Sequence, residues 1–269
     1  MSKQYPRLQQ VHVEIIPWHH HAASKGHESV LKYLRSLPKN ARVAAEFHAK
    51  NLGSYARQFA LGRFYPTVDP WLKLSWKQLA AAELYHECRK RNINLLPLGS
   101  LSSVAGMELA GKGIEPSKSL EDVVVLVKSR ARVDESLARN ILNLASSRAS
   151  PLRLVVIVGA AHAQVLANNL AERGARVRLR DDIFDESTRD HFRNVFEFIR
   201  MQREFAQSRD IDVLGSKILK QAELLEKGEA GDLSDEARFS RIQSFYQDFR
   251  EWQSKHARRI LNKLHKPRK

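Results

Sequence analysis

The apolar and polar positions along the chain alternate in a way that predicts strands separated by helices. Val11–Ile16 reads as a strand, and we expect a second strand over Ala41–His48. Between them, Ser24 is a suitable N-cap for a helix that must end before Pro38. A strand, a helix and a strand in this order are typical of a βαβ unit, in which the two strands run parallel.

The same alternation continues to about residue 180. We expect a helix over Ser75–Arg91 and a strand in the stretch NINLLPLG that follows it. The continuous apolar run Leu152–Gly159 predicts a strand buried on both faces, at the centre of a parallel sheet. The remaining expected elements are helices over Asp134–Ala145 and Ala163–Arg173, a stop at Gly174 and a last strand in ARVRLR. The predicted fold class is therefore α/β, with a mostly parallel sheet flanked by helices.

Beyond about Phe184 the pattern is that of helices only, which predicts an α/β domain over residues 1–184 and a basic helical extension over 185–269. The longest predicted helix, Ser234–Leu264, carries an apolar stripe at helical spacing. Its members are Ile242, Phe245, Tyr246, Phe249 and Trp252. Such a stripe faces either the core or a partner, and core packing is the more usual cause.

Composition and charge narrow the class of protein. With 269 residues, 43% of them hydrophobic, the chain can bury a substantial core and is not a disordered chain. Its formal net charge of +15 attracts polyanions, so RNA, DNA and anionic lipid surfaces are candidate partners. The positive charge is densest after Trp252, at Lys255, Arg258, Arg259, Lys263, Lys266, Arg268 and Lys269. We therefore keep a nucleic acid bound by the basic tail as an alternative function.

The single cysteine, Cys88, excludes an intramolecular disulfide and a thiolate-rich metal site. Any metal must then be held by His and carboxylate side chains. The polar start of the chain predicts no secretory signal, and the most apolar long window, Leu152–Leu170, is interrupted by polar residues. We expect a cytoplasmic protein without a membrane span.

Histidines follow two of the predicted strands. His20 stands three residues after Pro17, and His162 stands three residues after Gly159, at the first turn of a predicted helix. Functional groups in a parallel α/β sheet gather beyond the carboxyl ends of the strands, so these histidines are expected at one edge. Side chains of the run 19–21 cannot all point the same way in extended backbone. His20 is the first choice of that run and His19 the second.

A glutamate ends the second predicted strand at the same expected edge. Glu46 and His48 lie two residues apart, and therefore on one face of an extended segment. A cluster of His20, Glu46 and His162, with His19 as a further ligand, has the donor types that bind a divalent metal such as Mn, Zn, Co or Fe and leave positions for water. The same cluster also has the groups that activate water without metal, by general base catalysis.

The ordered set of motifs resembles the TraB/PrgY group and its relatives, the TIKI proteases, ChaN and the erythromycin esterases. Pro17-Trp18-His19-His20 corresponds to a first GxxH motif with Pro17 in place of glycine, and Gly159-Ala160-Ala161-His162 corresponds to the second. Glu46 matches the strand-end glutamate, ELYHECRKRNINLLPLG resembles the central helix and strand, and SRARVDESLARNI resembles a helix with a functional arginine. For that arginine, Arg132 and Arg130 are the two candidates. The resemblance covers roughly Val11–Arg180 and does not include the helical tail.

The resemblance implies a hydrolase-like site, in a peptidase or an esterase, that acts on a peptide or a small molecule. In such a site His20 and His162 bind metal or transfer protons, Glu46 is a ligand or base, and Arg132 stabilises negative charge. Members of this superfamily include metal-dependent proteases, esterases and a haem-binding protein, so the reaction does not follow from the fold. The alternatives are a nucleic-acid-associated protein that binds through its basic helices, and a haem or ligand carrier.

Overall fold

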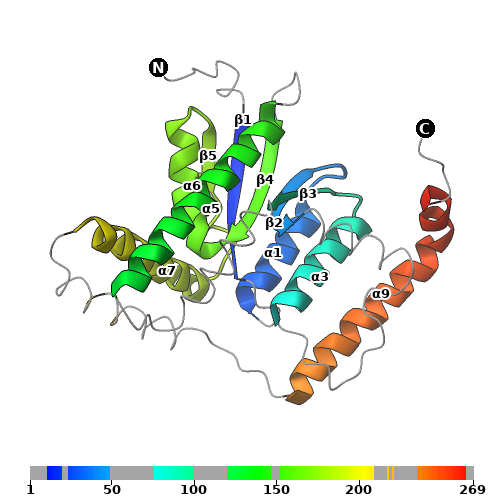
Figure 1. The fold of residues 1–269 in the computed structure, drawn as a ribbon. Helices are drawn as coiled ribbons and strands as arrows, with labels where there is room; N and C mark the ends of the chain where they lie inside the picture. Colours follow the sequence, from blue (N-terminus) through cyan, green and yellow to red (C-terminus); the bar gives the residue numbers. More distant parts are fainter. Residues whose placement is uncertain are drawn as a thin grey trace.

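The computed structural model shows a five-stranded sheet flanked by helices (Figure 1) and describes residues 11–19, 24–48, 76–99, 120–146, 152–208, 217, 220 and 235–264. The strands are β1 (Val11–Trp18), β2 (Arg42–His48), β3 (Asn94–Gly99), β4 (Leu152–Gly159) and β5 (Arg176–Leu179). The helices are α1 (Lys25–Ser36), α3 (Trp76–Lys90), α5 (Leu120–Ser146), α6 (Ala160–Glu172), α7 (Glu186–Gln207) and α9 (Asp235–Leu264). The predicted α/β class is confirmed.

All strand pairs of the sheet are parallel, and the strand order is β3-β2-β4-β1-β5. The expectation of a buried central strand is confirmed, because β4 lies in the middle and Leu154, Val156 and Val158 are fully buried. From β2 the chain continues outward to β3, whereas from β4 it continues in the opposite direction to β5. The carboxyl ends of β2 and β4 therefore flank a topological switch point, where open α/β sheets form a crevice.

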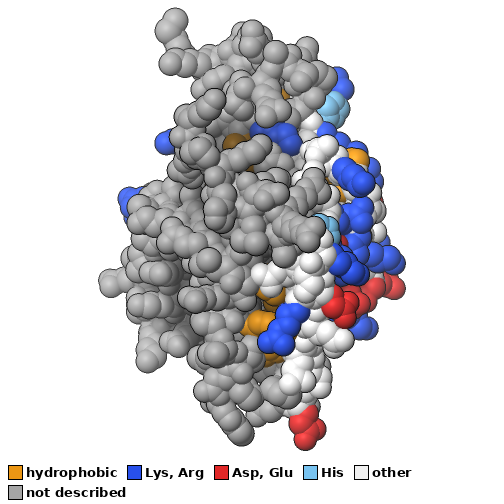
Figure 2. Space-filling model, turned by 90° about the vertical axis from the view of Figure 1, so that its right-hand side faces the viewer, with side chains coloured by type: hydrophobic (Ala, Val, Ile, Leu, Met, Phe, Trp, Pro, Cys, Tyr) orange, Lys and Arg blue, Asp and Glu red, His pale blue; other side chains and the backbone are white. Residues whose placement is uncertain are grey.

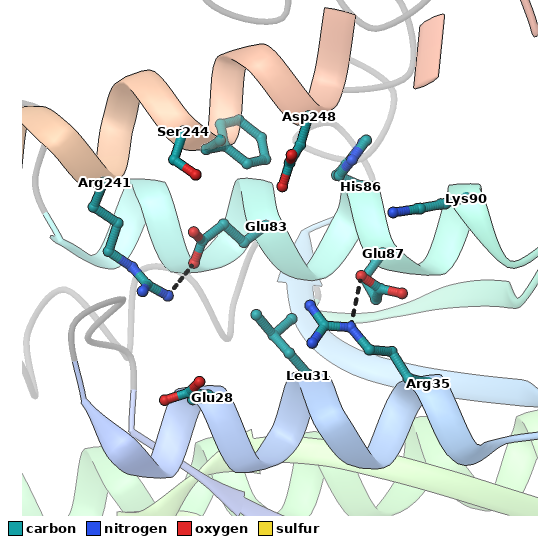
Figure 3. Close-up of a pocket in the computed structure, with 11 residues that line it drawn as sticks. Glu28, Leu31, Arg35, Glu83, His86, Glu87, Lys90, Arg241, Ser244 and Asp248 are labelled. Atoms are coloured by element: carbon teal, nitrogen blue, oxygen red, sulfur yellow. Dashed lines mark hydrogen bonds and ion pairs between the residues drawn. The ribbon is translucent and has the colours of Figure 1, made fainter. Parts of the chain in front are cut away.

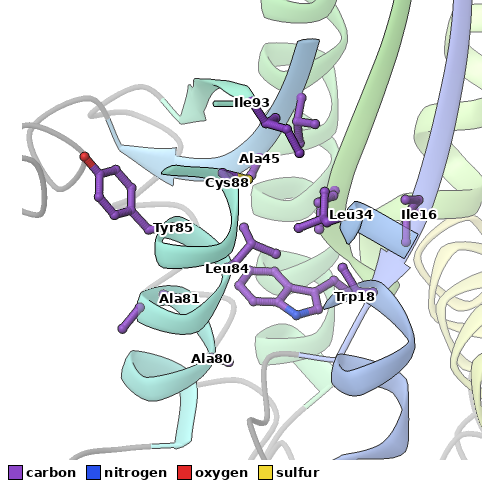
Figure 4. Packing of buried hydrophobic residues seen from close by; sticks show 14 of the residues in the cluster. Ile16, Trp18, Leu34, Ala45, Ala80, Ala81, Leu84, Tyr85, Cys88 and Ile93 are labelled. Atoms are coloured by element: carbon purple, nitrogen blue, oxygen red, sulfur yellow. The ribbon is translucent and has the colours of Figure 1, made fainter. Parts of the chain in front are cut away.

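Two buried clusters lie on opposite faces of the sheet. Residues of α1 and α3 pack with Ile16, Val43 and Val155 on one face, and residues of α5 and α6 pack with Val13 and Val156 on the other. Figure 4 shows the first cluster, in which Leu84 of α3 faces Trp18 at the end of β1 and Leu34 of α1 lies nearby. Beyond this layer α7 contacts α5 and α6, and α9 contacts α3 (Figure 1).

Helix boundaries follow from local capping. Ser24 accepts a hydrogen bond from the backbone N–H of His27, and Asp185 accepts one from that of Thr188, so each satisfies a backbone N–H at a helix start. The chain leaves α6 through Gly174, whose φ of +90° is a left-handed conformation that glycine adopts without a steric penalty. The N-cap at Ser24 and the stop at Gly174 are as the sequence predicts.

Two helices begin earlier than expected. Helix α5 begins at Leu120 rather than at Asp134. Its first part contains the β-branched run Val123–Val125, and such residues favour strands, so the sequence does not indicate the earlier start. Helix α6 begins at Ala160 rather than at Ala163, directly after the strand. The earlier start places His162 in the first turn of α6.

The apolar stripe of α9 packs against α3, which confirms its expected role in core packing. Phe245, Phe249 and Trp252 are buried, and their rings meet the ring of His86 edge-on at centroid distances of 5.6, 5.5 and 5.7 Å. Phe249 belongs to the same buried cluster as Ile16 of the sheet. The division into residues 1–184 and 185–269 stays a prediction.

The expectation that the chain has no membrane-spanning helix can be compared with the described helices. Its helices include none with a continuous apolar stretch long enough to cross a bilayer. The long helix α9 carries charged residues beside its apolar ones, such as Arg241, Asp248 and Arg250.

Candidate functional site

The carboxyl ends of β2 and β4 are joined by a glutamate side chain. Glu46 Oε2 accepts a hydrogen bond from the backbone N–H of Gly159 at 2.7 Å. The pairing of β2 with β3 shifts register between Ala45 and His48, so Glu46 lies within an irregularity of the strand. Such bulges change the direction of side chains and are frequent next to active sites. Glu46 is therefore held at the switch point, as the sequence predicts for a strand-end residue.

His162 projects from the first turn of α6 and binds a carboxylate of α5. Its Nδ1 lies 2.6 Å from Asp134 Oδ1, and both side chains are buried. Because an ionised carboxylate only accepts hydrogen bonds, Nδ1 carries the proton and donates a hydrogen bond to Asp134. This fixes the imidazole ring and leaves Nε2 as the nitrogen that Asp134 does not engage.

The second oxygen of Asp134 binds an arginine from α7. Arg203 donates from Nη2 to Asp134 Oδ2 at 3.1 Å, and its neighbour Gln202 accepts a bond of 2.5 Å from Arg130 Nη1. Helix α7 lies in the region predicted as an extension, yet it completes this buried network. Glu46, Arg130, Asp134, His162, Gln202 and Arg203 are together called the His162 cluster below.

The two candidate arginines occupy different sides of α5. Arg130 is 5% exposed and bonded to Gln202, whereas Arg132 is exposed to solvent. Two residues correspond to about 200° of rotation on a helix, so they cannot face the same site. Of the two candidates, Arg130, one helical turn before Asp134, lies at this edge, and the exposed Arg132 does not. A functional role for either arginine stays a prediction.

Opposing effects set the protonation of His162. Burial disfavours the imidazolium ion, but the bond to Asp134 and the nearby charge of Glu46 outweigh it and raise the pKa of His162 above its ordinary value. Burial lowers the pKa of Arg130 to about 10, although Asp134 opposes this change. At neutral pH Arg130 therefore stays a cation, and it lies close to the buried carboxylate of Asp134.

The other predicted ligands are not brought to His162 by the described residues. His20 and His21 lie outside the described residues, as does the side chain of His48. His19 lies with its ring edge-on to His191 of α7, at a centroid distance of 5.1 Å. Among the described residues, no group of three or more His, Cys, Asp or Glu side chains is placed to hold a metal ion. The described residues thus do not form the predicted metal site by themselves.

A second polar region lies between α1, α3 and α9, where a pocket of about 210 Å³ opens (Figure 3). Of the four carboxylates that line it, two form ion pairs between helices, Glu87 with Arg35 at 3.2 Å and Glu83 with Arg241 at 3.4 Å. Glu83 Oε2 also accepts from Nε2 of the buried His27, at 2.9 Å. These contacts hold the three helices together, and we therefore place the candidate site at the His162 cluster.

Sequence reasoning missed Asp134, Gln202 and Arg203 as site residues. A signal for Asp134 exists, because it follows Arg130 by four residues and therefore shares its face of the helix. No local signal marks Gln202 and Arg203, since their place depends on how α7 packs across α5 and α6.

The fold and the His162 cluster define an all-parallel α/β protein with a buried Asp–His pair at a topological switch point. Comparison of the chain with family models, with curated proteins and with solved structures finds no match in any of the three. The resemblance to the TraB group stays a prediction from the sequence motifs.

Proposed function

We propose that the chain is a hydrolase of the TraB/TIKI-like type, a peptidase or an esterase, with His162 as its proton-transferring residue. The observation that carries the proposal is the 2.6 Å bond between His162 and the buried Asp134, beside Glu46 at the switch point. Asp134 holds the ring so that Nε2 takes a proton from the attacking water and returns it to the leaving group. This is the role that an orienting carboxylate has in hydrolases of unrelated folds.

The charged neighbours of the pair have separate roles in this proposal. Arg203 binds the second oxygen of Asp134 and fixes the position of that carboxylate, so that it continues to orient His162. Arg130 supplies a buried positive charge for the oxyanion that develops when water attacks a carbonyl group. Glu46 adds negative charge close to His162 and favours its protonated form.

A divalent metal enters the proposal only together with His20, which the sequence places near His162. Such a metal would lower the pKa of a bound water. Elemental analysis of protein purified without a His tag, compared with the His20→Ala/His162→Ala double variant, tests this part. Stoichiometric Mn, Zn, Co or Fe in the wild type alone supports a metal site, and metal in neither protein after reconstitution removes it.

The substrate class is a peptide or a small-molecule ester or amide, and we propose a cytosolic location.

Cys88 is fully buried, and burial together with Glu87 raises the pKa of its thiol far above the ordinary value. The chain's one thiol is therefore an inert core residue rather than a nucleophile. In this proposal the attacking group is water activated by His162.

The test is a screen of nitrophenyl esters and fluorogenic peptides with three proteins made in parallel. These are the wild type, His162→Gln, and the control His12→Gln, in which an exposed histidine of β1 is replaced in the same way. We expect wild type and control to hydrolyse the same substrate and His162→Gln to lose about 10²- to 10⁴-fold in kcat. Equal rates in His162→Gln and wild type would show that another group, or a contaminant, performs the reaction.

A further inference from the structure

A row of basic side chains, three arginines and a histidine, crosses three neighbouring strands at the amino-terminal end of the sheet. Arg153 on β4 and Arg176 on β5 are each in register with His12 on β1, which lies between them. Side chains in register on parallel strands lie on one face, with about 4.8 Å between adjacent strands. Arg178, two residues after Arg176, lies on the same face. We call these four residues the arginine row.

The arginine row is open to solvent. The side chains of Arg153 and Arg178 are 60% and 64% exposed, and His12 and Arg176 are also exposed. Farther along the same strands, positions on this face are buried, as Ile16 and Val155 show. The helical layer thus covers the face toward the carboxyl ends and leaves its amino-terminal part uncovered.

The charges beside the row do not balance it. Glu14 binds Arg153 at 3.0 Å and Arg180 at 3.4 Å. Asp182 binds Arg178 and Arg180, so two carboxylates face four arginines when Arg176 is included. Among the described residues, Arg176 has no ion-pair partner. The four arginines therefore outnumber the carboxylates that bind them by two, on a chain whose net charge is already +15.

We infer that the arginine row binds the phosphate backbone of a nucleic acid. Guanidinium groups bind phosphate oxygens in pairs, which suits arginine better than lysine for this purpose. A nucleic acid fits better than a membrane, because on this face the row's own strands expose no apolar side chain that would enter a bilayer. Figure 2 shows one side of the molecule, on which Lys and Arg side chains, with fewer Asp and Glu side chains among them, lie along a margin of the described surface.

This surface is independent of the proposed hydrolase site. The row lies at the amino ends of β1, β4 and β5, and the His162 cluster lies at the carboxyl ends of β2 and β4. The arginine row is also distinct from the basic tail that follows Trp252. Loss of hydrolysis and loss of nucleic-acid binding are therefore expected from different variants.

The test measures fluorescence anisotropy of a labelled single-stranded RNA and a labelled DNA duplex, each of roughly 20 nucleotides per strand, with the full chain. The variant Arg153→Gln/Arg176→Gln/Arg178→Gln removes two paired arginines and one without an ion-pair partner among the described residues. Its control makes the same kind of change elsewhere, at Arg139, Arg193 and Arg250, of which the first two are ion-paired. Circular dichroism confirms that both variants fold.

We expect the row variant to bind at least one of the two probes about tenfold or more weakly than the wild type. For the single strand, the slope of the logarithm of the binding constant against the logarithm of the salt concentration should become shallower by roughly 2, at about 0.7 per lost phosphate contact. The control should stay within about threefold of the wild type. Equal loss in both variants, no loss in the row variant, or no binding of either probe by the wild type overturns the inference. Row-dependent binding to vesicles rich in anionic phosphatidylserine, without binding to nucleic acid, overturns it in favour of a membrane.

Discussion

Asp134 connects three elements through its two carboxylate oxygens. One oxygen accepts from His162 of α6 and the other from Arg203 of α7, while Asp134 itself belongs to α5 and is 1% exposed. A buried carboxylate is costly unless every lone pair that faces the interior finds a donor. The two bonds therefore explain how a charged group is kept at this depth, and they fix the geometry of the imidazole.

Replacing Asp134 with asparagine tests whether Asp134 stabilises the protonated form of His162. The amide side chain of the Asp134→Asn variant carries no negative charge, so the imidazolium would lose its main support and the pKa of His162 should fall. NMR titration of the His162 ring measures this directly. The control Glu135→Gln changes the adjacent, half-exposed carboxylate, which binds Arg173. An unchanged pKa of His162 in Asp134→Asn would contradict the assigned role of Asp134.

The same pair sets a pH dependence of stability. The folded pKa of His162 lies above 6.5, its ordinary value. The Asp134–His162 contribution is then fully present below pH 6.5 and is lost as the pH rises through the folded pKa. We expect the difference in free energy of unfolding between wild type and Asp134→Asn to shrink over that range, as measured by urea denaturation at several pH values. A difference that grows with pH would contradict the sign.

Arg130 and Arg132 form a matched pair for mutation. Arg130→Gln should lower hydrolysis by about 10- to 1000-fold, because it removes a buried charge near the reacting groups. It should also destabilise the fold by about 1–3 kcal/mol, since Gln202 loses its charged partner. Arg132→Gln, at an exposed position, should stay within about 0.5 kcal/mol. Equal effects of the two changes on kcat would remove Arg130 from the site.

At the scale of elements, helices α7 and α9 pack against the helices that flank the sheet. Helix α7 supplies Arg203 to Asp134, and α9 places Phe245, Phe249 and Trp252 around His86 of α3. Both helices pack through apolar faces that repeat at helical spacing, which the sequence shows clearly for α9. What the sequence does not show is where such a face packs, because that depends on residues distant in the chain.

His86 makes the packing of α9 sensitive to pH. Burial, reinforced by Lys90, lowers the pKa of His86 to about 4, from 6.5. The unfolded chain therefore binds a proton between these values that the folded chain does not, and stability falls as the pH falls from 6.5 toward 4. The change amounts to at most about 3 kcal/mol.

Urea denaturation at pH 7, 5.5 and 4.5 measures this effect as a difference between variants. His86→Leu should lose less stability on acidification than the wild type, because leucine binds no proton in either state. The control His12→Leu replaces an exposed histidine and should lose as much as the wild type. The same acid response in His86→Leu and wild type would show that other groups cause it.

For the molecule as a whole, the sequence predicts the class and the positions of the five strands well. Alternating apolar residues, Ser24, Gly174 and the apolar run of β4 carry enough local information for that. The candidate site is predictable only in part. Glu46 ends β2 and His162 follows β4 in the first turn of α6, positions that the sequence indicates, whereas Asp134, Gln202 and Arg203 come together through packing between helices.

The choice between Arg130 and Arg132 shows why sequence alone falls short. Both fit a loose motif, and only the rotation of α5 against α6 and α7 decides which one is buried. The strand order matters in the same way. The position of β4 between β2 and β1 creates the switch point, and pairing between strands distant in sequence determines that order.

Chemical rescue of His162→Ala is the most direct test of the central claim, that His162 transfers protons in a hydrolytic reaction. The variant is assayed on the best substrate of the wild type, with and without added imidazole. We expect His162→Ala to lose most activity and imidazole to restore part of it, more effectively than a weaker base such as triazole. Full activity in the variant without imidazole, or a loss that no added base relieves although the protein is folded, would contradict proton transfer by His162.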